Sequence, residues 1–302
     1  MDLYIVDFKQ GNDLTVCIVE DFPNKVFSSL VIQIDAIKQL IEDIVVDDVF
    51  DYELILNNPV SLKFLNDDLT KVIIEPLNTT WDKFSAEIKT INRFHFVNAP
   101  DLDRLKTLFG YFIKEVPRGK KFYRARISTD KSGFKLNEMG NPPGDKVKGG
   151  RANPEGISYL YLSSDIKTTI YETRASLFDF VSIATFRLEH NIRIINLSSD
   201  TYDIFRLAEL EQLEEVLLHS SFIQKLEEEL SRPKRKSDSD LEYLPTQYLS
   251  ELIKSMDIDG IEFRSSLYSD GYNLAIFNPE KFKVLDVTVY DVSRIDVEFE
   301  KV

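Results

Sequence analysis

The sequence is poor in the residues that build disulfides and metal sites. It has one cysteine, Cys17, so no disulfide can form within the chain and a zinc site made of thiolates is excluded. Its three histidines are scattered without the spacing of a ligand motif, so we expect no bound metal. No run of roughly 18 apolar residues occurs, and the first residues lack a signal peptide's basic start and apolar core. We therefore expect a cytoplasmic protein without a membrane span.

Basic residues are also in the minority. The chain has 37 Lys and Arg against 51 Asp and Glu, which gives a net charge of −14. This balance argues against broad nucleic-acid binding, which needs a basic face. It does not argue against a small anionic ligand, because a few local cations set the field inside a cleft. The length of 302 residues allows one large domain or two ordinary ones.

Apolar spacing predicts a mixed, partly helical region in the first part of the chain. Short strands are expected at 3–8 and 14–20, and a helix is expected at 34–46. A better helix begins at Asn78, and a further one begins at Pro100-Asp101 and stops near Pro117. The apolar face of the helix that begins at Asn78 comprises Trp81, Phe84, Ile88, Ile91 and Phe94. We place a domain boundary after residue 117, which separates a region 1–117 of unknown role from a second domain, 118–302.

The second domain alternates strands with helices, which predicts an α+β fold. Strands are expected at 120–128, 157–162, 180–188, 192–197, 260–266, 273–277 and 283–289. Helices are expected at 166–177, over most of 201–230, and from Leu244 onwards. The polar, Gly- and Pro-rich stretch from Thr129 to Gly150 is long for a loop inside a compact domain, which is typical of a lid or of disorder.

Chemically active residue types gather between Lys148 and Arg174. Gly150 allows close approach of the backbone to a ligand, and Arg151 offers a fork of donors for phosphate oxygens. Tyr161 supplies a flat face and a hydroxyl, and Glu172 brings a carboxylate to a basic neighbourhood. Each residue also has an ordinary interpretation, because a mid-helix glutamate is usually solvated and a strand tyrosine often belongs to the core. The pattern alone indicates a pocket for a phosphate-bearing ligand.

Six segments in order resemble the RES domain, a family named for an arginine, a glutamate and a serine. They are FYRAR, GGRANPEGISYLYLS, TTIYETR, YLPTQYLSELIK, DGIEFRSS and GYNLAIF, spread over roughly residues 118–290. The resemblance implies a fold like that of the diphtheria-toxin-like ADP-ribosyltransferases, a compact split β-structure with surrounding helices. It further implies breakdown of NAD by hydrolysis or phosphorolysis of the nicotinamide–ribose bond. Many members are toxins paired with an antitoxin that covers the active site.

The resemblance also assigns roles to individual residues. Glu172, Arg151 and Ser265 are the expected catalytic residues, and Glu172 would stabilise the positive charge that develops on the ribose. Arg124, Tyr161, Gly150 and Asn153 are the expected substrate-binding residues. NAD enters as a substrate and not as a cofactor, a cognate antitoxin is the expected protein partner, and homo-oligomerisation is left open. Two positions depart from the family, which often has an aromatic residue in place of Ala152 and a proline in place of Arg264.

Two other functions remain open at this stage. The same fold could transfer ADP-ribose to a macromolecule, although Ile170 stands where many transferases have the first member of a Gln/Glu-x-Glu pair. A module that binds a nucleotide or a partner without catalysis is the other alternative. The sequence does not choose between hydrolysis and phosphorolysis.

Overall fold

The computed structural model describes residues 4–6, 60–62, 75–198, 213–232, 239–268 and 270–295. Contacts divide the chain into two compact units, Met1–Thr79 with Asp200–Phe222, and Thr80–Ser199 with Ile223–Val302. The division after residue 117 stays a prediction. In the first unit, β1 (Tyr4–Val6) pairs with β2 (Val60–Leu62) in antiparallel fashion. The strand expected at 14–20 and the helix at 34–46 lie outside the described residues.

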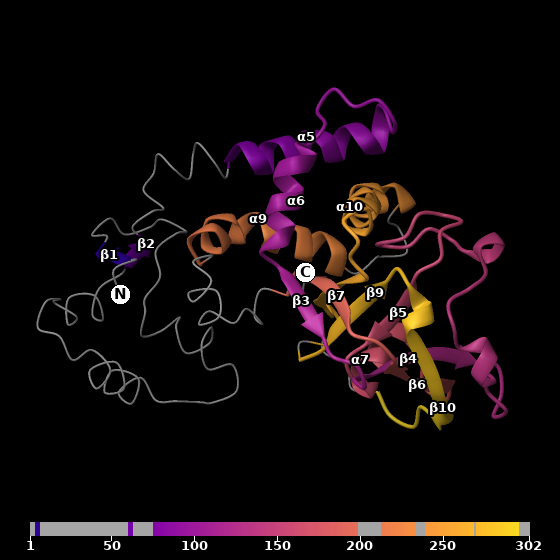
Figure 1. Cartoon of the computed structure of the whole chain (residues 1–302). Coiled ribbons are helices and arrows are strands. Elements are labelled where there is room, and N and C mark those ends of the chain that lie inside the picture. Colours follow the sequence, from indigo (N-terminus) through magenta and orange to yellow (C-terminus); the bar gives the residue numbers. More distant parts are fainter. Residues whose placement is uncertain are drawn as a thin grey trace, which may run out of the picture. The chain divides into compact units, whose positions relative to one another are not determined.

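The second unit is built on a sheet of eight described strands in the order β10-β6-β4-β5-β9-β8-β7-β3. The strands are β3 (Ile113–Val116), β4 (Lys121–Ser128), β5 (Leu160–Ser163), β6 (Phe180–Leu188), β7 (Ile192–Asn196), β8 (Gly260–Arg264), β9 (Tyr272–Ile276) and β10 (Phe282–Asp291). Neighbours are antiparallel except β7 and β8, which are parallel. Figure 1 shows these strands in magenta to yellow. The predicted α+β class is confirmed.

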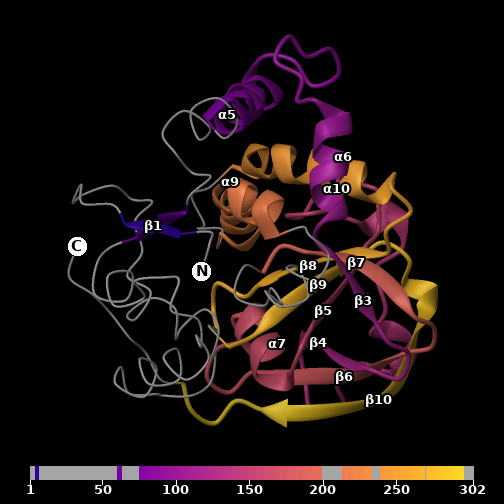
Figure 2. The ribbon, with the colours of Figure 1, turned by 60° about the vertical axis from the view of Figure 1, so that its left-hand side comes forward.

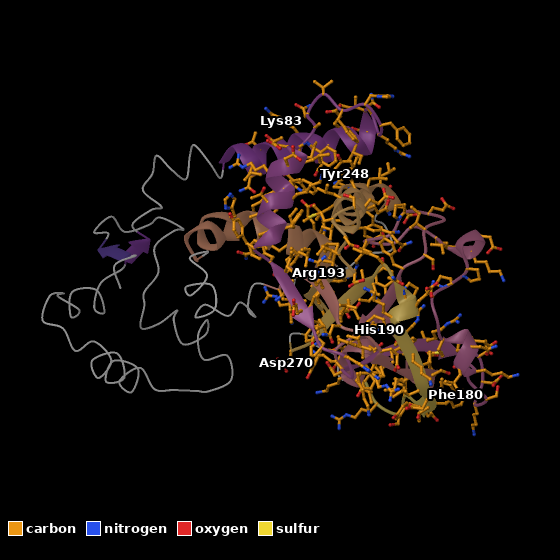
Figure 3. All side chains as sticks on the ribbon, viewed as in Figure 1. Lys83, Phe180, His190, Arg193, Tyr248 and Asp270 are labelled. Atoms are coloured by element: carbon orange, nitrogen blue, oxygen red, sulfur yellow. The ribbon has the colours of Figure 1, made fainter. Side chains whose placement is uncertain are left out.

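Five helices accompany the strands in the described part of the chain. They are α5 (Glu75–Thr90), α6 (Leu102–Gly110), α7 (Ile166–Thr173), α9 (Leu213–Ser231) and α10 (Leu244–Lys254). Pro245 lies in the first turn of α10, where its missing N–H costs nothing. Tyr248 of α10, labelled in Figure 3, contacts Phe84 of α5 with ring centroids 4.8 Å apart. Aromatic packing therefore joins these two helices.

The helix predicted to begin at Asn78 and to include Phe94 is wrong at both ends. It starts at Glu75 and stops at Thr90, so that Ile91 and Phe94 are 80% and 85% exposed. The reason is local hydrogen bonding. The carboxylate of Glu87 accepts bonds from the backbone N–H groups of Val97 and Asn98 at 2.7 and 2.9 Å, which folds the chain back.

Residues 113–116 also differ from expectation, because they form an edge strand and not the end of a helix. The preceding helix α6 is capped by Asp101, whose carboxylate accepts from Asp103 N and Arg104 N, and it ends at Gly110. The chain then runs antiparallel to β7 as β3. The apolar periodicity of a short amphipathic helix continues into β3, which explains the error.

The long stretch from Thr129 to Gly150 is folded and not disordered. It contains two short 3₁₀ turns, η2 (Leu136–Glu138) and η3 (Gly144–Lys146). Met139 lies between them and is fully buried in the cluster that packs against the sheet. Burial of one large side chain in the middle of a polar loop fixes its path over the domain.

The sheet is split between β4 and β5. On one edge, β4 pairs with β6 along its whole length, from Lys121 to Ser128. On the other edge it pairs with β5 only through Tyr123 and Ser163. The next free backbone donor on β4, Ala125 N, donates at 2.9 Å to the Thr169 hydroxyl of α7. Helix α7 therefore replaces strand pairing at this point, and Figure 2 shows it beside β4 and β5.

Candidate active site

A cavity of about 540 Å³ opens at this split. It is lined by Arg124, Ala125, Gly149, Gly150, Arg151, Tyr161, Leu162, Ser163, Thr169, Glu172, Thr173, Asp240, Tyr243, Phe263 and Asn273. Most of the lining comes from β4, β5, α7 and the Gly-rich loop, which are the segments that the sequence singled out. The volume lies in the range of small-molecule sites, and the lining mixes cations, carboxylates and aromatic rings.

Helix α7 carries Glu172 into the cavity. Asp165 caps the helix by accepting from Thr168 N, and Arg174 ends it in the left-handed conformation at φ 52°. The predicted extension to Leu177 is therefore wrong. Thr169, Glu172 and Thr173 are spaced three and four residues apart, so they share the face of α7 that lines the cavity.

Two hydrogen bonds fix the carboxylate of Glu172. Its Oε1 accepts from Ser265 Oγ at 2.6 Å and from Asn273 Nδ2 at 2.8 Å. Both bonds reach the same oxygen, and none from a described residue reaches Oε2. The carboxylate is thus held through one oxygen while the other is available to the contents of the cavity.

Ser265 is buried just beyond β8 and does not line the cavity itself. Its hydroxyl donates to Glu172 and accepts from Leu267 N and Tyr268 N, each at 3.2 Å. The proton and the acceptor capacity of the hydroxyl are therefore occupied. Among the three expected catalytic residues, Arg151 and Glu172 line the same cavity and Ser265 holds one of them in place.

Arg124 projects from β4 as a cation without a full set of partners. Its Nη1 is buried and has no hydrogen-bond partner among the described residues. Burial, reinforced by repulsion from Arg126 and partly offset by the Tyr161 hydroxyl, lowers the pKa of Arg124 to about 10. A buried guanidinium nitrogen without an acceptor is costly, and an anion in the cavity would supply that acceptor.

The Gly-rich loop is fixed to α10 through its carbonyl groups. Gln247 Nε2 donates to Gly150 O at 2.8 Å, and the Thr246 hydroxyl donates to Arg151 O at 2.6 Å. A side chain at Gly150 would come within 2.5 Å of Asn153 Oδ1, so only glycine fits there. These contacts hold the loop while Arg151 lines the cavity and its Nη1 donates to Leu230 O at 3.5 Å.

Asn153 does not line the cavity, in contrast to its expected role as a substrate-binding residue. It is 4% exposed, and its amide donates to three loop carbonyls, of Lys148, Pro154 and Ile157. Its Oδ1 accepts from the Tyr161 hydroxyl at 2.8 Å. An asparagine in a Gly-rich loop suggests ligand binding, but here the amide supplies the hydrogen bonds that shape the loop.

Tyr161 lines the cavity, but its hydroxyl is already used. Besides donating to Asn153, this hydroxyl accepts from Ala152 N at 3.2 Å. Burial raises the pKa of Tyr161 to about 12, against the opposing effect of the Ala152 and Asn153 backbones and of Arg151. The ring, and not the hydroxyl, is what Tyr161 offers to a ligand.

A family model for the RES domain matches residues 121–299, which is more than half of the chain. The chain belongs to the RES domain family. A search of curated proteins finds no match to the sequence. Among solved structures, the chain is similar to one from the "Crystal structure of the M.tuberculosis MbcT-MbcA toxin-antitoxin complex". The identity is 13% and the TM-score is 0.38, over 64% of this chain and 94% of that chain.

Two departures of this RES domain from its family are explained by packing. Arg264 forms an ion pair with Glu227 at 2.9 Å, and the side chain of Glu227 is only 2% exposed. The arginine therefore neutralises a buried carboxylate of α9. Ala152 is a fully buried residue of the Gly-rich loop and does not line the cavity, so the position serves loop packing and not ligand contact.

Sequence reasoning missed Asn273 as a site residue. It donates to Glu172 and accepts from the Ser163 hydroxyl at 2.8 Å, which links β5, β9 and α7. One signal was present in the sequence, because Asn273 is a polar residue in the otherwise apolar strand NLAIF. Thr169, Thr246 and Gln247 gave no such signal, since their partners lie on elements that are distant in sequence.

Other features of the RES domain bear on ligands and membranes. Across the described residues, no helix is both long and apolar enough to span a bilayer. In the same part of the chain, no three potential metal-binding side chains of His, Cys, Asp or Glu come together. The residues that gather at the split are suited to an organic ligand with anionic groups.

Proposed function

We propose that this protein is a RES-type toxin that cleaves the nicotinamide–ribose bond of NAD, by hydrolysis or phosphorolysis. The observation that carries the proposal is that the carboxylate residue Glu172 and the cationic residues Arg124 and Arg151 line the same cavity. Membership of the RES family supports it, because members break down NAD. A partner antitoxin and a role in defence or growth arrest rest on the same family resemblance.

The pyrophosphate of NAD suits the two arginines. Each guanidinium can bind phosphate oxygens through two parallel N–H groups. Arg124 has a buried nitrogen that lacks an acceptor, and a phosphate oxygen would satisfy it. The local cations outweigh the acidic character of the whole chain, because their field acts at short range inside the cavity.

The carboxylate of Glu172 suits the reacting sugar. When the bond between ribose C1′ and the nicotinamide nitrogen breaks, the electron pair leaves with neutral nicotinamide, and C1′ becomes an oxocarbenium ion. The free Oε2 of Glu172 stabilises this positive charge, an effect worth about 3–4 kcal/mol for a fixed charge in a partly dry site. Water or inorganic phosphate then bonds to C1′. The products are nicotinamide with ADP-ribose and a proton, or nicotinamide with ADP-ribose phosphate.

Ser265 acts through Glu172 and not on the substrate. Its hydroxyl is saturated by Glu172 and two backbone N–H groups, so it has no lone pair free for attack. Together with Asn273 it fixes the rotamer of Glu172 and keeps Oε1 engaged. Both residues are therefore assigned a positioning role in the proposed reaction.

Nicotinamide release tests the proposal. Purified full-length protein would be incubated with NAD, with and without inorganic phosphate, and the products separated by chromatography. Free nicotinamide with ADP-ribose indicates hydrolysis, and a phosphorylated sugar product seen only with phosphate indicates phosphorolysis. Folded protein that releases no nicotinamide under either condition would refute the proposed activity, and label from NAD that stays on a protein would favour ADP-ribose transfer.

A further inference from the structure

A turn at residues 265–271 joins β8 to β9 and supplies the Ser265 hydroxyl that holds Glu172. Two backbone hydrogen bonds close this turn. Ser265 N donates to Gly271 O at 2.9 Å, and Gly271 N donates to Tyr268 O at 3.2 Å. Because the turn is closed on itself, the place where it rests on the domain decides where Ser265 presents its hydroxyl.

The 265–271 turn rests on α7 through a pair of stacked aromatic rings. The ring centroids of Tyr268 and Tyr171 lie 5.5 Å apart, and the two ring planes make an angle of 8°. The ammonium group of Lys167 lies 5.0 Å from the centroid of the Tyr268 ring. Lys167 and Tyr171 are spaced four residues apart on α7, so they share one face of the helix. Two side chains of α7 therefore hold the ring of Tyr268.

The backbone of the turn also meets α7 directly, at Gly271. A Cβ atom at this position would overlap the Thr168 hydroxyl, so only glycine fits there. Thr168 is itself fixed, because its backbone N–H and its hydroxyl both donate to the carboxylate of Asp165. The end of the 265–271 turn is thus packed against the first turn of α7, and its rings are packed against the second.

Tyr268 also takes part in the hydrogen bonds around Ser265. Its backbone N–H donates to Ser265 Oγ at 3.2 Å, and this hydroxyl donates to Glu172 Oε1 at 2.6 Å. Tyr171 and Glu172 are adjacent residues of α7. The turn therefore contacts the helix both at the aromatic ring of Tyr171 and at the carboxylate of Glu172, and Tyr268 belongs to both contacts.

The stacked pair lies at the surface and not in the core. Tyr171 is 44% exposed and Tyr268 is half-buried. Neither residue belongs to the buried cluster on the sheet, and neither lines the cavity that contains Glu172. The role that the contacts leave to this pair is to fix the 265–271 turn on α7.

We propose that Tyr268, stacked on Tyr171, is a positioning residue that orients the carboxylate of Glu172. The inference rests on the proposed function, in which Oε2 of Glu172 faces the reacting ribose. With the stack in place, the turn keeps the Ser265 hydroxyl on Oε1 and so holds one rotamer of Glu172. Without the stack, the turn moves away from α7 and only the bond from Asn273 remains on Oε1. The carboxylate then no longer meets the developing charge in a fixed position.

Steady-state kinetics of NAD cleavage by the full-length protein test this role. Tyr268→Ala should lower kcat about tenfold, or about 1.4 kcal/mol, which a stacked pair and a cation–π contact can contribute together. KM should stay unchanged, because Tyr268 does not line the cavity. Tyr268→Phe keeps the ring and should have the kcat of the parent protein. Tyr290→Ala is the matched control, since Tyr290 is a tyrosine of β10 with 42% exposure. An unchanged kcat in Tyr268→Ala would overturn the proposal.

A double-mutant cycle separates positioning from a general loss of structure. Glu172→Ala leaves no carboxylate to be oriented. If Tyr268 acts through that carboxylate, adding Tyr268→Ala to Glu172→Ala should leave the residual kcat unchanged. A structural defect would instead lower kcat about tenfold in both backgrounds, and such additive losses would refute the positioning role.

Crystal structures of the variants separate this inference from the proposed function. The bond from Ser265 Oγ to Glu172 Oε1 should be broken in Tyr268→Ala and should persist in Tyr268→Phe at the 2.6 Å of the parent protein. An intact bond in Tyr268→Ala would refute the positioning role even in a protein that cleaves NAD. A broken bond in a protein that never releases nicotinamide would support the positioning contact and refute the proposed function. Should Tyr268→Ala fail to fold, Tyr171→Ala removes the more exposed ring of the same stack and should give the same results.

Discussion

The two edges of β4 differ in what they are used for. Toward β6, eight residue pairs continue without a break, and this edge contributes only to the sheet. Toward β5, a single pair is followed by a helix, a cavity and a buried arginine nitrogen without an acceptor. Strand pairing gives the backbone N–H and C=O groups their hydrogen-bond partners. Where the pairing is interrupted, other groups such as the Thr169 hydroxyl must supply these partners. The comparison shows that this fold makes room for a cavity by opening the edge of one strand.

The largest effect should come from neutralising the carboxylate at the open edge. Glu172→Gln keeps an oxygen that can accept from Ser265 and Asn273, but it removes the negative charge. Nicotinamide release should fall about 10²–10³-fold, as it does when a fixed group that stabilises a transition state is lost. Glu280→Gln, an exposed glutamate in the 3₁₀ turn before β10, is the control and should retain activity. Full activity in Glu172→Gln would remove the basis of the proposed mechanism.

The edge of β4 that faces β5 should also be the one where the loss of a single hydrogen bond lowers the stability of the fold. Thr169→Val preserves the shape of the side chain but leaves Ala125 N without its acceptor. The free energy of unfolding should decrease by about 1–3 kcal/mol, the cost of an unsatisfied buried donor. Thr169→Ser, which keeps the hydroxyl, should lose less. Chemical denaturation followed by circular dichroism measures both, and equal losses in the two variants would contradict the role given to this bond.

Replacement of Arg124 should increase the stability of the fold and at the same time weaken ligand binding. Arg124→Met removes a desolvated cation whose Nη1 lacks a partner, so the free energy of unfolding should rise by about 1–3 kcal/mol. Binding of NAD or ADP should weaken at the same time. Thermal unfolding with and without ADP tests both, because ADP should raise the Tm of the parent protein and not that of the variant. A destabilised Arg124→Met would show that the guanidinium has a structural role.

The smallest effect should come from the cap at the start of α7, and it should depend on pH. Burial raises the pKa of Asp165, but hydrogen bonds from the Thr168 hydroxyl, the Thr168 and Lys167 backbones and Ser164 outweigh it, so the pKa lies below its ordinary range. The ionised carboxylate therefore stabilises the fold above about pH 4, and this contribution is lost as the pH falls through the lowered pKa. Asp165→Asn keeps an oxygen that can cap the helix but loses the negative charge, so it should cost about 0.3–1 kcal/mol at pH 7.

The same cap variant should differ little from the parent protein at low pH. Denaturant titrations at pH 7 and at the lowest pH at which the parent protein stays folded measure the change in this difference. A gap that stays constant between the two values would mean that Asp165 acts through shape and not through charge. Asp145→Asn, at an exposed position in η3, serves as the control at both values.

The sequence revealed the parts of the molecule that depend on local patterns. The strand from Phe180 to Leu188 was predicted to the residue, and so was the first residue of α7, Ile166. The gathering of Arg151 and Glu172 in one cavity followed from the order of the segments in the family. Periodicity, capping and turn chemistry act within a few residues, so they can be read from the chain alone.

What the sequence could not reveal depends on contacts between distant segments. Asn153 is an asparagine in a Gly-rich loop, which suggests ligand binding from the sequence. Only the folded loop shows that its amide donates to three carbonyl groups. Asn273 approaches Glu172 across 101 positions of sequence. The end of α5 was missed because Glu87 accepts bonds from residues ten and eleven positions ahead. Long-range polar contacts of this kind leave no periodic signal.

The saturated hydroxyl of Ser265 has a practical consequence for inhibitor chemistry. Organophosphorus and sulfonyl fluoride reagents phosphorylate or sulfonylate serines that are accessible and activated by a neighbouring base. Ser265 is buried, its hydroxyl donates a hydrogen bond to Glu172, and its oxygen accepts from two backbone N–H groups. Such warheads would find no nucleophile at this position. Under the proposed function, compounds directed at the protein should instead imitate a cationic sugar next to a diphosphate.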